Sequence, residues 1–308
     1  MDWLLCIAVA VFASAAAIFI DNYVSDYYFK GREANAQKNF YWLPFIIIGI
    51  VCVCIAGVNF TDIPFHVYLL FMLSGMSTSI AGIFYYKSLE LSDSTDFGIF
   101  VQLSPVFYLI LGWLFLGQNI NTVQFIAFLI IFSAPILIIL TTKKRSRHLR
   151  LKAVCYAVLD ILIEAVAALI FVKFNTENVD FLTEIGFVFL GKGLGNALIM
   201  LAKPKWRKRY RFVVKSSGRK IYLPFIGNTM LSFANTFARN LALVLAPSIA
   251  IVSSILDSTR PIVIFFLGLL FTLLWPRFGR EKMTKKVIMV HLIATALVVA
   301  GICLIQST

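Results

Sequence analysis

The sequence predicts an all-α integral membrane protein with ten transmembrane helices, arranged as two inverted five-helix repeats around a central cavity. Hydrophobic residues make up 60% of the 308 positions and charged residues 14%, whereas soluble domains average about 45 to 50% and about 25%. The mean hydropathy is +0.88. The apolar residues gather in runs of about 20, the length of helix that crosses a roughly 30 Å hydrocarbon core. This composition excludes a soluble single-domain enzyme.

Ten apolar runs follow one another along the chain, and each is expected to form one membrane-spanning helix. The first run is expected to persist as an uncleaved helix, because Asp2 precedes it where a signal peptide carries Lys or Arg. The runs cover residues 3–20, 41–58, 66–86, 97–116, 122–141, 152–172, 182–202, 221–243, 248–275 and 286–306.

Basic residues are concentrated in alternate links between these runs. The links after the first, third, fifth, seventh and ninth runs, counted with Lys152 and Lys286 at the ends of the runs that follow them, contain 24 of the 28 Lys and Arg residues. Because cytoplasmic loops hold the excess of Lys and Arg, both termini are expected on the non-cytoplasmic side. The formal charge of +13 therefore reflects membrane topology, and no nucleic-acid partner is expected. The most basic link, residues 203–220, is expected to contact lipid headgroups.

An internal repeat divides the chain in two. With a constant shift of 156 residues, positions 105–115 align with 261–271, and five of the eleven are identical, including a proline and a glycine. The first repeat is predicted over 1–142 and the second over 152–308, joined by a basic cytoplasmic linker at 143–151. Five spans per repeat is an odd number, so the second repeat must enter the membrane inverted. Secondary transporters built on this plan bind their solute near the midplane, between the halves.

Short motifs recur in both halves. The first half contains Tyr-Tyr-Lys-Ser-Leu at 85–89, Leu-Ser-Pro-Val-Phe at 103–107 and Gly-Trp-Leu-Phe-Leu-Gly-Gln at 112–118. The second half contains Asn-Leu-Ala-Leu at 240–243, Arg-Pro-Ile at 260–262 and Gly-Arg-Glu-Lys at 279–282. These motifs resemble the EamA repeats of the drug/metabolite transporter superfamily, although Gln118 replaces an acidic residue that the second half keeps as Glu281. The resemblance implies ten helices around a central cavity and export or exchange of small metabolites, commonly amino acids, across the bacterial inner membrane.

Charged residues inside the predicted spans are the first candidates for a solute site. They are Asp160, Glu164, Lys192, Arg239, Asp257 and Arg260. At a rise of about 1.5 Å per residue, all except Arg239 lie in the middle third of a core roughly 30 Å thick. Arg260 is expected at the same depth in the membrane as Asp160, and Lys192 at the same depth as Glu164 and Asp257. Arg239 lies near the outer end of its span and is a candidate for an outer gate or a headgroup contact.

The two acidic residues of the sixth span cannot face lipid. Asp160 and Glu164 together cost about 5 to 7 kcal/mol in a membrane interior. The eleven Val, Leu, Ile and Phe residues of that span contribute a favourable insertion free energy of roughly 3 to 7 kcal/mol, which only about balances this cost. The span therefore needs polar partners in the rest of the bundle.

Polar residues recur at helical spacing in other spans and predict one water-filled cavity. Asn235 shares a stripe with Arg239, Tyr85 marks the third span, and Gln102 lies on the same face as Pro105. Small and polar residues also hold transmembrane helices together, which is the alternative interpretation of these stripes. Pro105 and Pro261 occupy equivalent positions and are candidates for helix breaks that permit gating.

No metal or cofactor is expected. The five cysteines lie within apolar runs, the three histidines lack neighbours that would make a ligand set, and no Ser-His-Asp constellation is present. The glycine-rich residues 191–195 lack the spacing of a phosphate-binding loop and are expected to permit close helix packing.

The leading functional prediction is a secondary transporter for a small polar metabolite, such as a zwitterionic amino acid. Its solute is expected to bind at the midplane, with the anionic group at Arg260 and Lys192. The carboxylates Glu164, Asp160 and Asp257 are the candidates to hold its ammonium group or to carry a coupling proton, and Glu164 is the first choice for the proton. A passive channel for small solutes remains an alternative, as does a membrane-embedded enzyme acting on lipid-linked substrates.

Overall fold

The computed structural model describes residues 3–29, 33–57, 64–92, 97, 100–117, 147–175, 179–246, 249–274 and 285–306, with scattered positions between 122 and 137. The secondary structure in these residues is helical. The α-helices of this part of the chain include α1 (Trp3–Tyr27), α2 (Lys38–Ala56), α3 (Phe65–Leu91), α5 (Ser104–Leu116), α7 (Arg147–Phe174), α8 (Phe181–Ala202), α9 (Pro204–Ser217), α10 (Tyr222–Leu245), α11 (Ile249–Leu274) and α12 (Lys285–Gln306). Three short 3₁₀ segments are η1 (Ala34–Gln37), η2 (Val101–Leu103) and η3 (Gly218–Ile221).

Each predicted apolar run except the fourth and the fifth coincides with a helix in the structure. Of the fourth run, 97–116, the α-helix α5 covers only the part from Ser104 to Leu116 and follows the 3₁₀ segment η2. The fifth run, 122–141, lies largely outside the described residues, so the count of ten spans stays a prediction. Five helical segments of the described chain are long and apolar enough to cross a membrane: α1, η1 with α2, α3, α7 and α8. Apolar side chains such as Leu43, Ile47 and Ile55 of α2 are exposed, as expected of a surface that contacts lipid. The fold is that of an all-α, multi-pass membrane protein.

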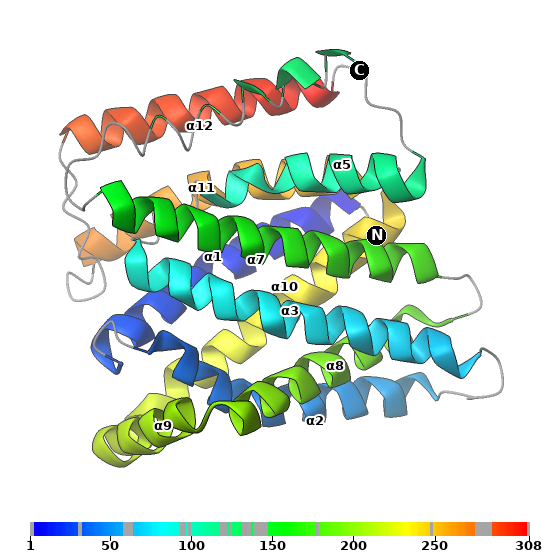
Figure 1. Ribbon diagram of the computed structural model, residues 1–308, viewed down its shortest axis with the longest axis vertical. Coiled ribbons are helices and arrows are strands. Elements are labelled where there is room, and N and C mark those ends of the chain that lie inside the picture. Colours follow the sequence, from blue (N-terminus) through cyan, green and yellow to red (C-terminus); the bar gives the residue numbers. More distant parts are fainter. Residues whose placement is uncertain are drawn as a thin grey trace.

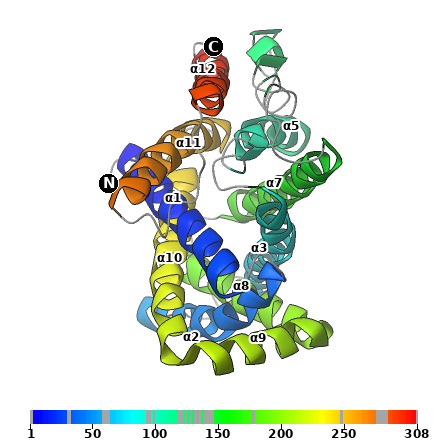
Figure 2. The same ribbon diagram turned by 90° about the vertical axis from the view of Figure 1, so that its left-hand side faces the viewer.

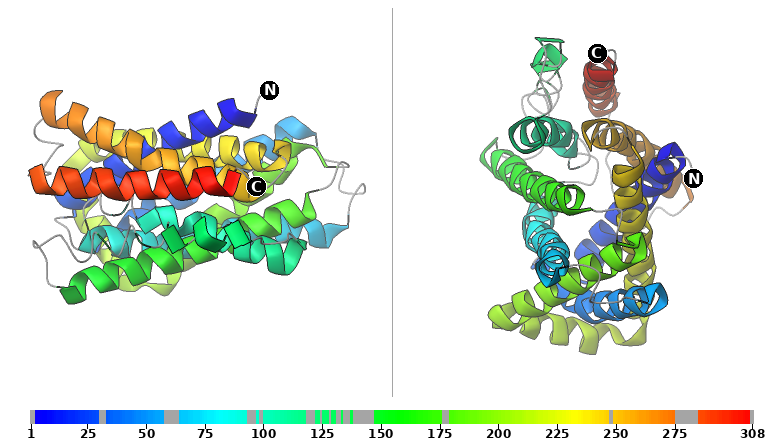
Figure 3. Two further views of the ribbon diagram at one scale, coloured as in Figure 1. Left: turned by 90° about the horizontal axis from the view of Figure 1, so that it is seen from above. Right: turned by 90° about the vertical axis from the view of Figure 1, so that its right-hand side faces the viewer.

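The long helices run side by side, and their ends define two faces of the bundle (Figure 1). Both chain termini lie at the right-hand end in this view, and α9 lies at the left-hand end. The main helix contacts are α2 with α8, α3 with α7 and α8, α1 with α10 and α11, and α5 with α7 and α11. α12 lies beside α11 at one edge of the bundle, and α2, α8 and α9 lie at the opposite edge (Figure 3).

The link at 203–220, for which the sequence predicts no helix, contains α9 and most of η3. Trp206, Tyr210 and Val213 recur at helical spacing and face the bundle, where Tyr210 packs edge-on against the Phe40 ring at 4.5 Å. Basic residues of α9 such as Lys208 and Arg211 remain exposed. α9 therefore lies across the ends of the other helices (Figure 2). Its amphipathic spacing was not recognised in the sequence, because the segment is polar on average.

Glycines bring α8 into close contact with two neighbouring helices, as predicted for residues 191–195. A Cβ atom at Gly186 would lie 2.7 Å from Val53 of α2, and one at Gly193 would lie 2.5 Å from Ile46 of the same helix. On another face of α8, a Cβ at Gly191 would overlap the backbone oxygen of Met72 in α3. Small residues are what permit such approach between membrane helices.

This packing predicts opposite effects for two glycine-to-alanine substitutions. Gly191→Ala should lower the free energy of unfolding by about 1 to 3 kcal/mol, because the backbone of α3 must move away. Gly227→Ala in α10 is the matched control: nothing lies within 4 Å of its Cβ position, and alanine is the better helix former. Thermal unfolding in detergent should show a lower midpoint for the first variant only. Equal midpoints would contradict the close α3–α8 contact.

Candidate functional site

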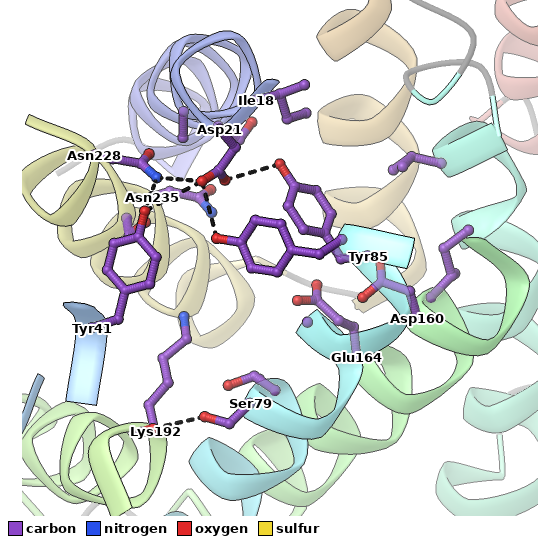
Figure 4. Close-up of a pocket in the computed structure, with 18 of the residues that line it drawn as sticks. Ile18, Asp21, Tyr41, Ser79, Tyr85, Asp160, Glu164, Lys192, Asn228 and Asn235 are labelled. Atoms are coloured by element: carbon purple, nitrogen blue, oxygen red, sulfur yellow. Dashed lines mark hydrogen bonds between the residues drawn. The ribbon is translucent and has the colours of Figure 1, made fainter. Parts of the chain in front are cut away.

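A cavity of about 180 Å³ lies among the helices, and side chains from α1, α2, α3, α5, α7, α8, α10 and α11 line it. Figure 4 shows the polar side chains from several helices that point toward it. Four acidic and four basic residues contribute to its wall, so its formal charge is zero. They are Asp21, Lys38, Asp160, Glu164, Lys192, Arg239, Asp257 and Arg260.

One ion pair lies on α11. An Nη atom of Arg260 is 3.2 Å from an Oδ atom of Asp257, and the two side chains are 11% and 4% exposed. The second carboxylate oxygen of Asp257 accepts a hydrogen bond from Ser253 at 2.9 Å. Arg260 also donates from Nε to Ser14 Oγ at 3.0 Å, so this pair connects α11 to α1.

A second ion pair joins three helices. Arg239 of α10 lies 2.7 Å from Glu164 of α7, and it also donates a hydrogen bond to the hydroxyl of Tyr108 in α5. The Glu164 side chain is 37% exposed, so it is the less buried partner. The pair also borders a smaller cavity of about 50 Å³, which is lined by residues such as Ser74 and Asn240. The Glu164–Arg239 pair thus contributes to the walls of two cavities.

Besides Asp21, which is described below, three charged groups in the main cavity have no ion pair in the part of the chain that the structure describes. Lys38 donates to the backbone oxygen of Ser79 at 2.7 Å and to Asn196 Oδ1 at 3.4 Å. Lys192 donates to Thr236 Oγ1 at 3.1 Å. Asp160, which is only 7% exposed, accepts no hydrogen bond from any described group. Besides Asp21, the cavity therefore presents one carboxylate and two ammonium groups that are not neutralised by a direct partner.

Asp21 of α1 is the fourth acidic residue, and it accepts hydrogen bonds from three other helices. Its Oδ1 accepts from Tyr41 at 3.3 Å, Tyr86 at 3.0 Å and the Asn228 amide at 2.8 Å. Its Oδ2 accepts from Tyr85 at 3.1 Å. Figure 4 shows these groups converging on the carboxylate from α2, α3 and α10. Asp21 is 7% exposed.

Most of the predicted site residues line the main cavity. They are Tyr85, Asp160, Glu164, Lys192, Asn235, Arg239, Asp257 and Arg260. Gln102 lies in η2, but its side chain is outside the described set. Pro105 stands in the first turn of α5, where proline is compatible with a helix, and Pro261 lies within α11, which continues to Leu274. A gating role for the two prolines stays a prediction.

The pairing expected from depth is wrong in two respects. Arg260 pairs with Asp257 rather than Asp160, because the two lie three residues apart on one helix face. Glu164 pairs with Arg239 rather than Lys192. Arg239 also lines the cavity, so it is not a headgroup contact. Depth alone could not predict these partners, because it carries no information on helix rotation.

Two charged residues of the site were missed by the sequence reasoning. α1 continues to Tyr27, beyond the predicted end at residue 20, and so Asp21 belongs to the helix instead of a link. Lys38 was counted with the cytoplasmic loops, yet it is 5% exposed and begins α2. The available signal was helical spacing: Ser14, Ile18 and Asp21 form one stripe of α1 that lines the cavity.

No group of three His, Cys, Asp or Glu side chains in the described chain is arranged to hold a metal ion.

Comparison with known proteins shows similarity to one family over the first half of the chain and to one fold over most of it. The sequence profile of the EamA-like transporter family matches residues 2–140. A protein of Sinorhizobium sp, described as "Uncharacterized transporter in cobO 3'region", is 28% identical over 136 residues, which is 42% of this chain and 89% of that protein. A solved structure described only as "Crystal structure of protein" is similar with a TM-score of 0.60, at 14% identity and over 96% of both chains. That similarity concerns the fold alone.

Proposed function

Because residues 2–140 match the EamA-like transporter family, we propose that the chain belongs to this family, within the drug/metabolite transporter superfamily, and is a secondary transporter of a small zwitterionic metabolite such as an amino acid. The solute binds in the main cavity and crosses by alternating access, as an export or an exchange. The two halves, 1–142 and 152–308, act as inverted five-helix repeats. The membrane is the bacterial inner membrane, with both termini on its outer side.

The helix contacts support the inverted plan. Under this plan, α1, α2, α3 and α5 of the first half correspond, in that order, to α7, α8, α10 and α11 of the second half. Exchanging the two halves then turns the contact between α1 and α10 into a contact between α7 and α3. It also turns the contact between α1 and α11 into a contact between α7 and α5. All four contacts are present, and α2–α8 and α5–α11 pair equivalent helices. The cavity has walls from both halves, as expected when two repeats move against each other.

The observation that carries the choice of solute is the pattern of unpaired charge in a cavity of zero net charge. An unpaired buried charge costs several kcal/mol, and a solute that brings the opposite charge relieves this cost. Asp160 supplies a carboxylate for an ammonium group, and Lys38 and Lys192 supply ammonium groups for a carboxylate. Arg260 is already paired with Asp257, so it is less suited to the solute's anionic group than the sequence suggested.

A counterflow experiment tests this function. Proteoliposomes are loaded with unlabelled members of a panel of amino acids, nucleosides and organic cations, and uptake of the labelled compound is measured. We expect saturable counterflow for at least one zwitterion. Saturable counterflow of organic cations alone would contradict the zwitterion, and single-channel currents without counterflow would instead favour a passive channel.

Asp160→Asn should reduce counterflow of that zwitterion by about tenfold or more, because a hydrogen bond to a charged group contributes about 1.5 to 3 kcal/mol. Asp180→Asn is the matched control. Asp180 is exposed at the start of α8, where its side chain accepts a hydrogen bond from the Leu182 amide, and asparagine caps a helix equally well. Equal rates for both variants would remove Asp160 from the solute site.

A further inference from the structure

Asp21 differs from the other acidic residues of the cavity in how its carboxylate is satisfied. Glu164 and Asp257 each have a guanidinium partner, whereas Asp21 has none among the described residues. An ionised carboxylate has about two acceptor positions on each oxygen. Oδ1 of Asp21 accepts three hydrogen bonds and Oδ2 accepts one, so the acceptor position that remains is on Oδ2. That position is where a proton can bind.

The charged and titratable groups around Asp21 come from each helix that packs near it. α2 contributes Tyr41 and Lys38, which interacts electrostatically with Asp21, and α3 contributes the hydroxyls of Tyr85 and Tyr86. From α10 comes the neutral amide of Asn228. The guanidinium of α11 is bound at Ser14, two turns away along α1. The charge of Asp21 is thus buried among neutral donors.

We propose that Asp21 is the proton-binding site that couples transport to a proton gradient, an inference that rests on the proposed transport function. Asp21 lines the cavity, so water in the cavity gives the proton access to it. Its ionised form holds α1, α2, α3 and α10 together through four hydrogen bonds. Glu164, the first choice from sequence, is less suited to this role because Arg239 lies 2.7 Å from it.

Protonation has a defined structural consequence at Tyr85. A proton on Oδ2 makes that oxygen a donor and a weaker acceptor, so the hydrogen bond that it accepts from the hydroxyl of Tyr85 weakens. Tyr85 also lines the cavity, and its ring contacts Phe97 edge-on at 5.0 Å. The protonation state of Asp21 is therefore communicated to the cavity wall through one side chain. Because Asn228 belongs to α10 and the tyrosines to α2 and α3, the same proton loosens the contact between the two halves.

A spectroscopic experiment tests the proton site without any solute. Infrared difference spectra of the reconstituted full-length protein, recorded while the pH is lowered through the neutral range, should show a protonated-carboxyl band together with a change in the tyrosine bands. Asp21→Asn should remove this band, and Asp26→Asn, an exposed position on the same helix, should retain it. Asparagine imitates the protonated carboxyl, since it keeps one acceptor oxygen and gains a donor. A band that persists in Asp21→Asn would overturn the proposal.

Transport by the wild-type protein separates the failure of this inference from the failure of the proposed function. An outward proton gradient should accelerate uptake of the transported zwitterion into proteoliposomes about tenfold, as proton-coupled exchange requires, and this acceleration should be lost in Asp21→Asn and kept in Asp26→Asn. Counterflow that does not respond to the gradient would refute the proton site and leave the transport function intact. Absence of counterflow for the entire panel would refute the transport function itself, whatever the infrared result.

Discussion

Replacing Arg260 with alanine should lower the free energy of unfolding by about 3 to 5 kcal/mol, the range found when one partner of a buried ion pair is removed. Asp257 would keep its hydrogen bond from Ser253 but lose its charged partner, and its side chain is only 4% exposed. The variant would also lose the hydrogen bond to Ser14 that connects α11 to α1. Reversible unfolding in mixed micelles, followed by tryptophan fluorescence, measures the change.

Two controls identify the unpaired charge as the cause. The double variant Asp257→Asn with Arg260→Gln removes both charges and keeps polar side chains, so its loss should be smaller than that of Arg260→Ala. Arg219→Ala changes an exposed arginine of η3 and should stay within about 0.5 kcal/mol of the wild type. If Arg260→Ala were as stable as Arg219→Ala, the ion pair of α11 would not contribute to the stability of the protein.

The helices were predictable because the bilayer imposes the length and composition of a spanning segment. For the same reason, hydropathy placed Asp160 and Glu164 correctly inside the bundle, since neither side chain is tolerated by lipid. It failed at Asp21 and Lys38, which lie where apolar runs end and therefore resemble loop residues. Their burial depends on hydrogen bonds from other helices, which no local average of the sequence contains.

Partner choice was only partly accessible from sequence. The three-residue spacing of Asp257 and Arg260 contains the information for their pairing, although depth alone suggested another partner. The Glu164–Arg239 pair requires knowledge that α7, α10 and α5 converge, and this is a property of the assembled bundle. The glycines near Lys192 were interpreted correctly, because a phosphate-binding loop and a tight helix contact demand different spacings.

Breaking the Glu164–Arg239 pair should make the protein leaky. The pair borders both the main and the smaller cavity, and residues of the smaller cavity such as Ser74 and Asn240 lie toward the predicted outer ends of their helices. The pair therefore stands where a solute would pass between the two cavities. Arg239→Gln should raise passive efflux of a preloaded zwitterion by about tenfold or more, because a charge-assisted hydrogen bond contributes about 1.5 to 3 kcal/mol to the closed state.

The expected effect depends on the pair and not on either residue alone. Glu164→Gln should produce a similar leak, and the double variant should leak no more than the worse single one, as a double-mutant cycle requires for coupled residues. Tyr108→Phe removes only the hydroxyl that accepts from Arg239, so its leak should be smaller. Efflux of a labelled solute from proteoliposomes in the absence of any gradient measures all four. Strictly additive leaks would show that the two side chains act independently, and the pair could then not serve as the barrier between the cavities.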